Sequence, residues 1–189
     1  MGQYYIAIIL GEKGAKEFIR LAVSSLAYAN GAKLTEHCYV GNSFVEAVEY
    51  LLSPNGILYK SRLVWAGDYA DTESDSDENL YTRGCDEVSI EKLNRIHMHV
   101  PPEIYQSDLQ KFPYIVNHTK QLYVKKPAIN PKDYVIDPLP ILTAEGNGRG
   151  GGDYKGTDID LVGSWARDTI SMEVEPPTTY TELVCNFIE

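Results

Sequence analysis

Residues 4–10, YYIAIIL, are the stretch that decides the fold, because seven consecutive apolar residues, rich in aromatic and β-branched types, run up to Gly11. A run of this kind predicts a strand buried in a sheet. Further along the chain, residues 62–65 (RLVW) predict another strand. Segments 114–116 and 122–124 flank a polar turn, and this pattern predicts a β-hairpin.

Helical patterns occur at three places. Ser43 and Glu46 form a capping box that precedes a stripe of apolar residues, which indicates the clearest helix of the chain. Segment 15–29 has good helix formers with apolar residues at helical spacing, and Asn30-Gly31 offers a left-handed stop. A short helix is expected at 89–96.

The order of these elements indicates the fold class. Segments 33–40, 161–165 and 170–174 are expected to be extended, so strands and helices do not alternate regularly and the second half is mostly β. We therefore predict a single α+β domain over residues 1–189, with a largely antiparallel sheet and two to three helices. Three irregular segments are expected: an acidic, mobile loop at 68–79, a proline-rich connector at 127–140 and a glycine-rich loop at 146–156.

Composition restricts the possible partners. The net charge of −10 disfavours extended nucleic acid, whose binders concentrate lysine and arginine on one face. No apolar run approaches the roughly 18 residues of a membrane helix, and the first residues lack the basic region of a signal peptide. We expect a cytosolic protein without a membrane partner and with reduced cysteines. Fourteen tyrosines against four phenylalanines favour half-buried surfaces, so a homo-oligomer is expected.

The glycine-rich loop is the most unusual segment, since six of the eleven residues from 146 to 156 are glycine. Glycine is favoured where φ is positive or where another group approaches the backbone closely. Backbone N–H groups of such a loop can surround an anion, and Arg149 and Lys155 would add positive charge. Downstream, Trp165 supplies an aromatic plane, Arg167 a guanidinium and Asp168 a carboxylate for ribose hydroxyls.

Together these residues predict a site for a small phosphate-bearing ligand of the nucleotide type. The candidate ligand-binding residues are Asn147, Gly148, Arg149, Gly150, Gly151, Asp153, Tyr154, Lys155, Trp165, Arg167 and Asp168. The alternatives are that the loop carries no ligand, that Trp165 belongs to the core, and that Arg167 and Asp168 form a surface pair. No cofactor and no metal ion are expected, since His97 and His99 have no evident third ligand.

Two other functions remain open at this stage. A hydrolase or transferase acting on a nucleotide could use His37, next to Glu36, or Asp153 as its acid or base. Alternatively, the six carboxylates of 68–78 could bind a basic protein partner, as an inhibitor does. No catalytic signature accompanies the glycine-rich loop, so binding without turnover is favoured over catalysis.

Several short motifs resemble a set of uncharacterised bacterial and phage proteins. These motifs are the M-G-x-Y-Y start, G-D-Y-A-D at 67–71 and G-N-G-R-G-G-G-D-Y at 146–154. No activity is known for that set, so the resemblance implies only an origin and a compartment. By analogy with phage proteins that sequester small molecules, it favours a sequestering protein over an enzyme.

Overall fold

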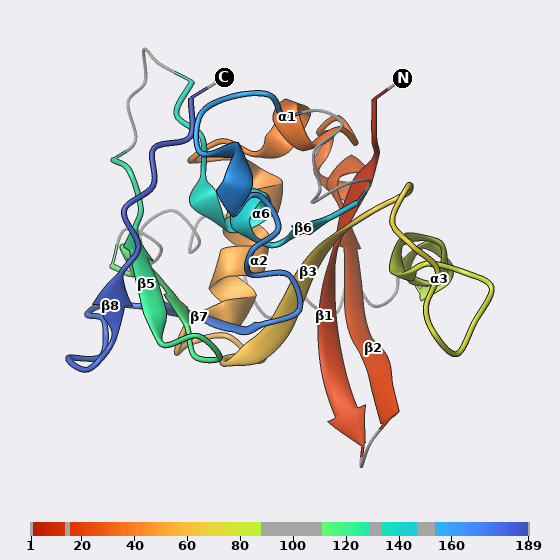
Figure 1. Ribbon diagram of the computed structural model, residues 1–189, viewed down its shortest axis with the longest axis horizontal. Helices are drawn as coiled ribbons and strands as arrows, with labels where there is room; N and C mark the ends of the chain where they lie inside the picture. The colour runs from red at the N-terminus through yellow and green to blue at the C-terminus, as the bar shows by residue number, and fades with distance from the viewer. Residues whose placement is uncertain (1, 14–15, 88–110, 129–133, 147–153, 189) are drawn as a thin grey trace.

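The computed structural model describes residues 2–13, 16–87, 111–128, 134–146 and 154–188. Figure 1 shows one sheet that runs through the molecule, with the N-terminal hairpin at one edge and the C-terminal segment near the other. The sheet has eight strands in the order β2-β1-β3-β7-β4-β5-β8, and β6 pairs with β3 beside this path. Among the described strands most pairs are antiparallel, and β3–β6 and β5–β8 are the parallel ones. The predicted α+β class with a largely antiparallel sheet is confirmed.

The first strand, β1 (Tyr5–Lys13), explains why its sequence is apolar without alternation. Tyr5, Ala7 and Ile9 point into the larger core on one face of the sheet. Ile6 and Ile8 point into a second, smaller core on the other face. Because both faces of the strand are covered, both sets of side chains must be apolar. The strand predicted at 4–10 is confirmed, and it extends further into a hairpin.

Each face of the sheet is covered by one long helix. Helix α2 (Ser43–Leu52) places Phe44 and Val48 in the larger core, and helix α3 (Leu80–Glu87) places Leu80 in the smaller one. Asn42, not Ser43, is the N-cap of α2, since its side chain accepts from the N–H groups of Phe44 and Val45. Within the described residues there are four α-helices, slightly more than the sequence predicts.

The predicted central strands and the predicted hairpin are confirmed. The strands are β3 (Ser61–Gly67), β4 (Tyr114–Asn117), β5 (Leu122–Lys125) and β7 (Thr169–Glu173). Strand β4 lies between β5 and β7, so the hairpin and β7 form one continuous part of the sheet. Two short parallel strands were not predicted, β6 (Ala144–Glu145) and β8 (Thr181–Glu182).

The helix predicted at 15–29 is wrong. Residues Lys16–Ser24 form strand β2, which pairs with β1 along its length, and a 3-10 helix follows at Ser25–Tyr28. Leu21 and Val23 enter the larger core while Ala22 enters the smaller one, so burial here has a period of two residues. Pairing with β1 outweighs the helical propensity of the segment, and residues 21–23 are buried on both faces of the sheet.

Three other segments also differ from the expectation. Residues Leu34–His37 are the short helix α1 instead of a strand, and Pro138–Leu142 are helix α6 within the supposed connector. Asp137 caps α6 by accepting from the N–H of Leu139. The strand expected at 161–165 is a 3-10 helix, Ile159–Leu161, followed by turns. The helix expected at 89–96 lies outside the described residues.

No helix in the described part of the chain is long and apolar enough to cross a membrane.

Candidate functional site

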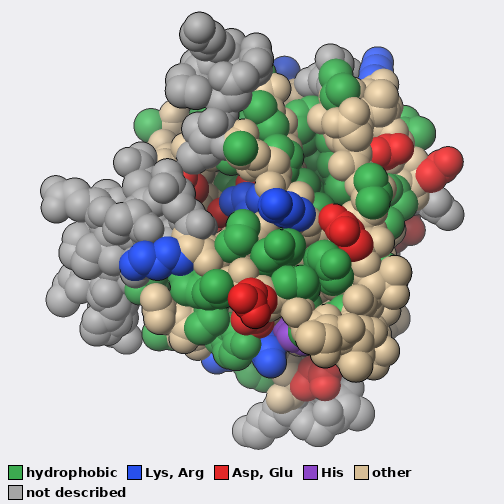
Figure 2. Space-filling model, turned by 90° about the vertical axis from the view of Figure 1, so that its left-hand side faces the viewer, with side chains coloured by type: hydrophobic (Ala, Val, Ile, Leu, Met, Phe, Trp, Pro, Cys, Tyr) green, Lys and Arg blue, Asp and Glu red, His purple; other side chains and the backbone are tan. Residues whose placement is uncertain are grey.

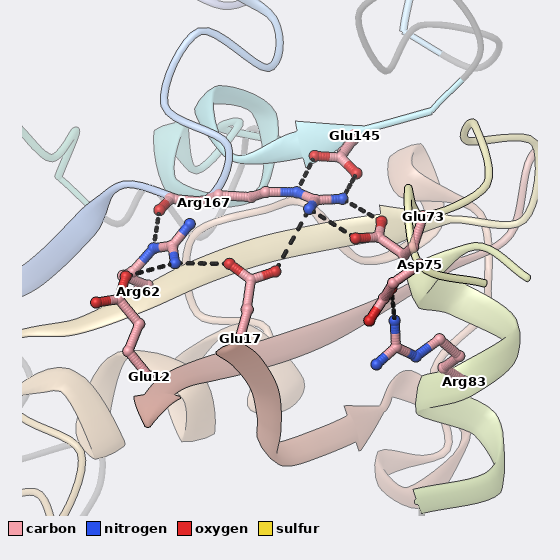
Figure 3. Close-up of polar contacts among 8 residues, drawn as sticks. All are labelled: Glu12, Glu17, Arg62, Glu73, Asp75, Arg83, Glu145 and Arg167. Carbon is pink, nitrogen blue, oxygen red and sulfur yellow. Dashed lines mark hydrogen bonds and ion pairs between the residues drawn. The ribbon is translucent and has the colours of Figure 1, made fainter. Parts of the chain in front are cut away.

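Arg167 stands at the centre of an ion-pair network (Figure 3). Its guanidinium meets both carboxylate oxygens of Glu73 end-on, at 2.5 and 3.0 Å. Both oxygens of Glu145 approach from the side, at 2.5 and 2.7 Å from Nη2 and Nε. Glu17 is 3.4 Å from Nη1 and also pairs with Arg62 at 2.6 Å. The network thus joins β2, β3, β6, the acidic loop and the turn before β7.

This network uses all the hydrogen-bonding capacity of Arg167. A guanidinium has five N–H donors, and the five contacts to Glu17, Glu73 and Glu145 account for them. Burial alone would lower the pKa of Arg167, but the hydrogen bonds from Glu145 and Glu73 outweigh it and raise the pKa. Arg167 therefore has no donor left for a phosphate while the network is closed.

The acidic loop at 68–79 is held in a defined conformation, in contrast to the expected mobile loop. Asn79 donates to the carbonyl oxygens of Asp68 and Ala70 at 3.0 and 3.1 Å. Glu73 binds Arg167, and Asp75 lies 3.4 Å from Arg83 of helix α3. Hydrogen bonds and ion pairs therefore fix this loop beside the sheet.

The structure does not bring Trp165, Arg167 and Asp168 together at one site. Trp165 is 1% exposed and belongs to the larger core. The side chain of Asp168 accepts from Asn117 and pairs with Lys120 at 2.8 Å, beside the β4–β5 turn. Arg167 points to Glu73 and Glu145, so the three side chains contact three different parts of the structure. The expected surface pair of Arg167 with Asp168 is also absent from the described contacts.

Of the glycine-rich loop, the structure describes only the two ends. Asn147, Gly148, Arg149, Gly150, Gly151 and Asp153 lie outside the described residues, and their part in a site stays a prediction. Tyr154 is fully buried in the larger core, and its hydroxyl donates to the carbonyl of Thr157 at 2.5 Å. Lys155 is exposed.

A Cβ on Gly146 would meet the side-chain ends of Gln3 and Tyr5, which can shift. Gly156 is required by close approach, because a Cβ there would overlap the backbone carbonyl oxygen of Ile188. At this end of the loop the chain is tied to the C-terminal segment, since the N–H of Thr157 donates to the same oxygen at 2.9 Å and its hydroxyl donates to the carbonyl of Asn186.

That C-terminal segment forms one wall of a groove of about 500 Å³. Cys185, Asn186, Phe187 and Ile188 line this wall. Tyr134, Val135, Ile136 and Pro138 line a second side, and Lys125 and Pro127, at and after the end of β5, line a third side. Figure 2 views the molecule from the side of β5 and β8 and shows many hydrophobic side chains on this face, with both basic and acidic ones among them.

The groove combines an apolar floor with a few polar groups. Cys38, Ile136 and Phe187 are buried and apolar. Tyr134 is 72% exposed at the rim, and its ring lies 4.6 Å from that of Tyr39 between centroids. Lys125 is exposed and is the basic side chain of the lining. Concave sites with this composition are typical of small-molecule binding.

His37 has a structural position that does not suit acid–base catalysis. The ring is fully buried, and Trp65 donates its indole N–H to Nε2 at 2.9 Å. Nδ1 therefore carries the proton and donates to the carbonyl of Gly31 at 3.0 Å. Glu36 accepts from the backbone N–H of Lys33, so the two neighbours do not act as a pair.

A second polar chain was not found by the sequence analysis. Nε2 of His118 lies 2.7 Å from Oγ of Ser171, which donates to Glu173 at 2.6 Å. Tyr59 donates to the same carboxylate oxygen at 2.7 Å. Burial, reinforced by the charge of Lys60 and opposed by Glu173, lowers the pKa of His118. Ser171 is fully buried, so its hydroxyl is not accessible as a nucleophile in this hydrogen-bonded group. No sequence signal links these residues.

Within the described ranges, no group of three or more histidine, cysteine or carboxylate side chains could hold a metal ion. His97 and His99 lie outside those ranges. Comparison of the chain with protein-family models, with curated proteins and with solved structures finds no match. The described residues therefore form an α+β fold with a concave, largely apolar groove beside the C-terminal segment. The resemblance to bacterial and phage proteins stays a prediction.

Proposed function

We propose that this protein binds a small phosphate-bearing ligand of the nucleotide type, and that the groove between the C-terminal segment and residues 134–138 is the site. The observation that carries the proposal is the junction at Gly156. There, the end of the glycine-rich loop lies against Ile188, which lines the groove. A loop rich in glycine thus leads directly to the wall of a concave apolar site.

The chemistry of the lining supports this class of ligand. The exposed ring of Tyr134 offers a face for stacking a base or another flat ring. The floor of Cys38, Ile136 and Phe187 would exclude water from an apolar part of the ligand. Lys125 supplies a positive charge for a phosphate, and the exposed Lys155 precedes Gly156 directly. Arg167 has no place in this proposal, because its donors are occupied.

Binding without turnover is the form of the proposal that the described residues support best. The histidine proposed as acid or base, His37, is enclosed by Trp65 and Gly31. The serine beside His118 has no exposed surface. Asp153, the other proposed acid or base, lies outside the described residues. We therefore favour sequestration of the ligand over a hydrolase or transferase reaction.

The first experiment is mass spectrometry of the freshly purified full chain, native and then denatured. A stoichiometric phosphate-bearing molecule released unchanged supports the proposal, and the native spectrum also tests the expected homo-oligomer. Titration calorimetry with AMP, adenosine and inorganic phosphate then locates the site. We expect AMP to bind more tightly than either part, and Lys125→Glu and Tyr134→Ala each to weaken AMP at least tenfold.

Arg167→Lys is the matched control for these variants. It lies outside the groove, so AMP affinity should change less than twofold. A loss of AMP binding in Arg167→Lys with normal binding in the groove variants would contradict the assignment of the groove. Absence of both a retained ligand and binding of millimolar AMP would contradict the proposed function.

A further inference from the structure

A cluster of buried charges lies directly behind the groove. Lys126 lies between the groove-lining Lys125 and Pro127, and its side chain turns inward, with 11% exposed. Its ammonium pairs with Glu49 of helix α2 and, at 3.1 Å, with Asp137. The side chains of Glu49 and Asp137 are both 0% exposed.

The cluster joins two sides of the groove. Asp137 lies between Ile136 and Pro138, which line the second side of the groove. Its backbone N–H donates to the carbonyl of Cys38 at 2.9 Å, and Cys38 also lines the groove. Lys126 belongs to the third side, after β5. The Lys126–Asp137 pair is therefore a direct polar link between these two sides.

The charges of this cluster do not balance. One ammonium faces two fully buried carboxylates, and Oε2 of Glu49 is buried without a hydrogen-bond partner. Two carboxylates on one buried cation cannot both be ionised without a large desolvation cost, so the cluster retains a proton. Desolvation first, and then the charge of Asp137, raises the pKa of Glu49 to about 8, while Lys126 opposes the shift.

Among the described residues, Glu46 is a further ionisable group beside the cluster. Glu46 lies one helical turn before Glu49, and burial followed by Asp137 raises its pKa against the effect of Lys126. Helix α2 also packs on β7 and on the 3-10 helix Ser25–Tyr28. The charged residue of β7, Glu173, bonds to Tyr59 and Ser171. Tyr28 is the titratable residue of the 3-10 helix, and its ring packs on Phe44.

We propose that Glu49, Lys126 and Asp137 form a proton-dependent brace that holds two sides of the groove together while Glu49 carries its proton. Loss of that proton leaves two negative charges on one ammonium in the interior. Asp137 and Glu49 then compete for Lys126, and the link between the two sides weakens. The brace itself is independent of any ligand. If the groove binds a ligand, binding should weaken at alkaline pH, and this second expectation rests on the proposed function.

Two measurements on the full chain without ligand test the brace. The carboxyl carbon of Glu49, assigned by its absence in Glu49→Gln, should titrate by NMR near pH 8 instead of in the ordinary range of glutamate. Amide hydrogen exchange, corrected for intrinsic rates, should show protection of Lys126 and Asp137 falling at least tenfold between pH 7 and 9.5. Glu49→Gln, which mimics the protonated acid, should remove that fall.

The amide of Leu63, which donates to Asp168 in the sheet, is the internal control and should keep its protection. Titration of Glu49 below pH 6, or an equal loss of protection in Glu49→Gln, would overturn the brace. If that variant does not fold, the pH dependence of amide exchange in the wild-type chain decides, because it needs no assignment from the variant. AMP binding at pH 7 and 9 is measured separately. Absence of AMP binding at both pH values would contradict the proposed function and would leave the brace unaffected.

Discussion

Arg167 and Glu73 meet through a bidentate pair, although 94 residues separate them in the sequence. The pair ties the acidic loop to the turn before β7, and Glu145 brings the start of the glycine-rich loop to the same guanidinium. The network therefore joins segments that the sequence gives no reason to connect. It also explains why an arginine expected to bind phosphate has no donor left for one.

Replacing Arg167 by lysine should destabilise the fold. An ammonium cannot reproduce the two parallel pairs with Glu73 and Glu145, so repulsion among the carboxylates increases. We expect the free energy of unfolding in urea to fall by about 1–2 kcal/mol, with partial exposure limiting the loss. Arg83→Lys is the control, because its 3.4 Å contact with Asp75 is exposed, and a change below about 0.5 kcal/mol is expected. Equal effects would contradict the role of the network.

Trp65→Phe should lower the free energy of unfolding by more than the loss of packing alone. The change removes the indole donor of Trp65 from Nε2 of His37 in a fully buried position. A buried acceptor left unsatisfied costs about 1–3 kcal/mol. Chemical denaturation of this variant and of Tyr59→Phe, which loses a bond at a residue 37% exposed, makes the comparison. A similar loss in both would show that burial of the bond has no effect.

Acid should destabilise the native state through His118. Its pKa in the folded protein lies below the ordinary value of 6.5, so the unfolded chain binds the proton more readily. The contribution of neutral His118 to the free energy of unfolding is fully present above pH 6.5. It is lost as the pH falls from 6.5 through the lowered pKa of the folded protein. His118→Asn should remove this part of the pH dependence in urea denaturation between pH 5 and 8. Parallel curves for variant and wild type would exclude the assignment.

Gly156→Ala should disturb the groove as well as the stability. The added methyl group meets backbone, the carbonyl of Ile188, and cannot be accommodated without moving the C-terminal segment. Overpacking of this kind costs about 1–3 kcal/mol. Thermal unfolding should show the loss, and AMP binding should weaken in the folded variant. Lys155→Ala, an exposed neighbour, should leave thermal stability unchanged.

The three thiols should react with iodoacetamide at pH 8 in the order Cys85, Cys185, Cys38. Burial raises the pKa of Cys85 and of Cys185. The pKa of Cys185 rises to about 11, so little of its thiolate is present at pH 8. Cys85 is exposed, whereas Cys38 is 2% exposed in the floor of the groove. Mass spectrometry of peptides after brief labelling gives the order. Labelling of Cys38 before Cys85 would contradict the burial described for the groove.

The sequence by itself determined the elements whose pattern is local. The apolar run at 4–10 predicted a buried strand, and the capping pattern near Ser43 predicted helix α2. The polar turn between 116 and 122 predicted the hairpin of β4 and β5. In each case the residues that form the element also carry the signal, through periodicity, caps or turn chemistry.

Tertiary structure alone decided the rest. Segment 16–24 has helical spacing, yet it is a strand, because pairing with β1 and the burial of residues 21–23 exceed a propensity of tenths of a kcal/mol per residue. Trp165, Arg167 and Asp168 are close in sequence, but the turn that contains them directs Trp165 into the core and the other two to different partners. The groove and the Glu49–Lys126–Asp137 cluster depend on contacts between distant segments, which no local pattern encodes.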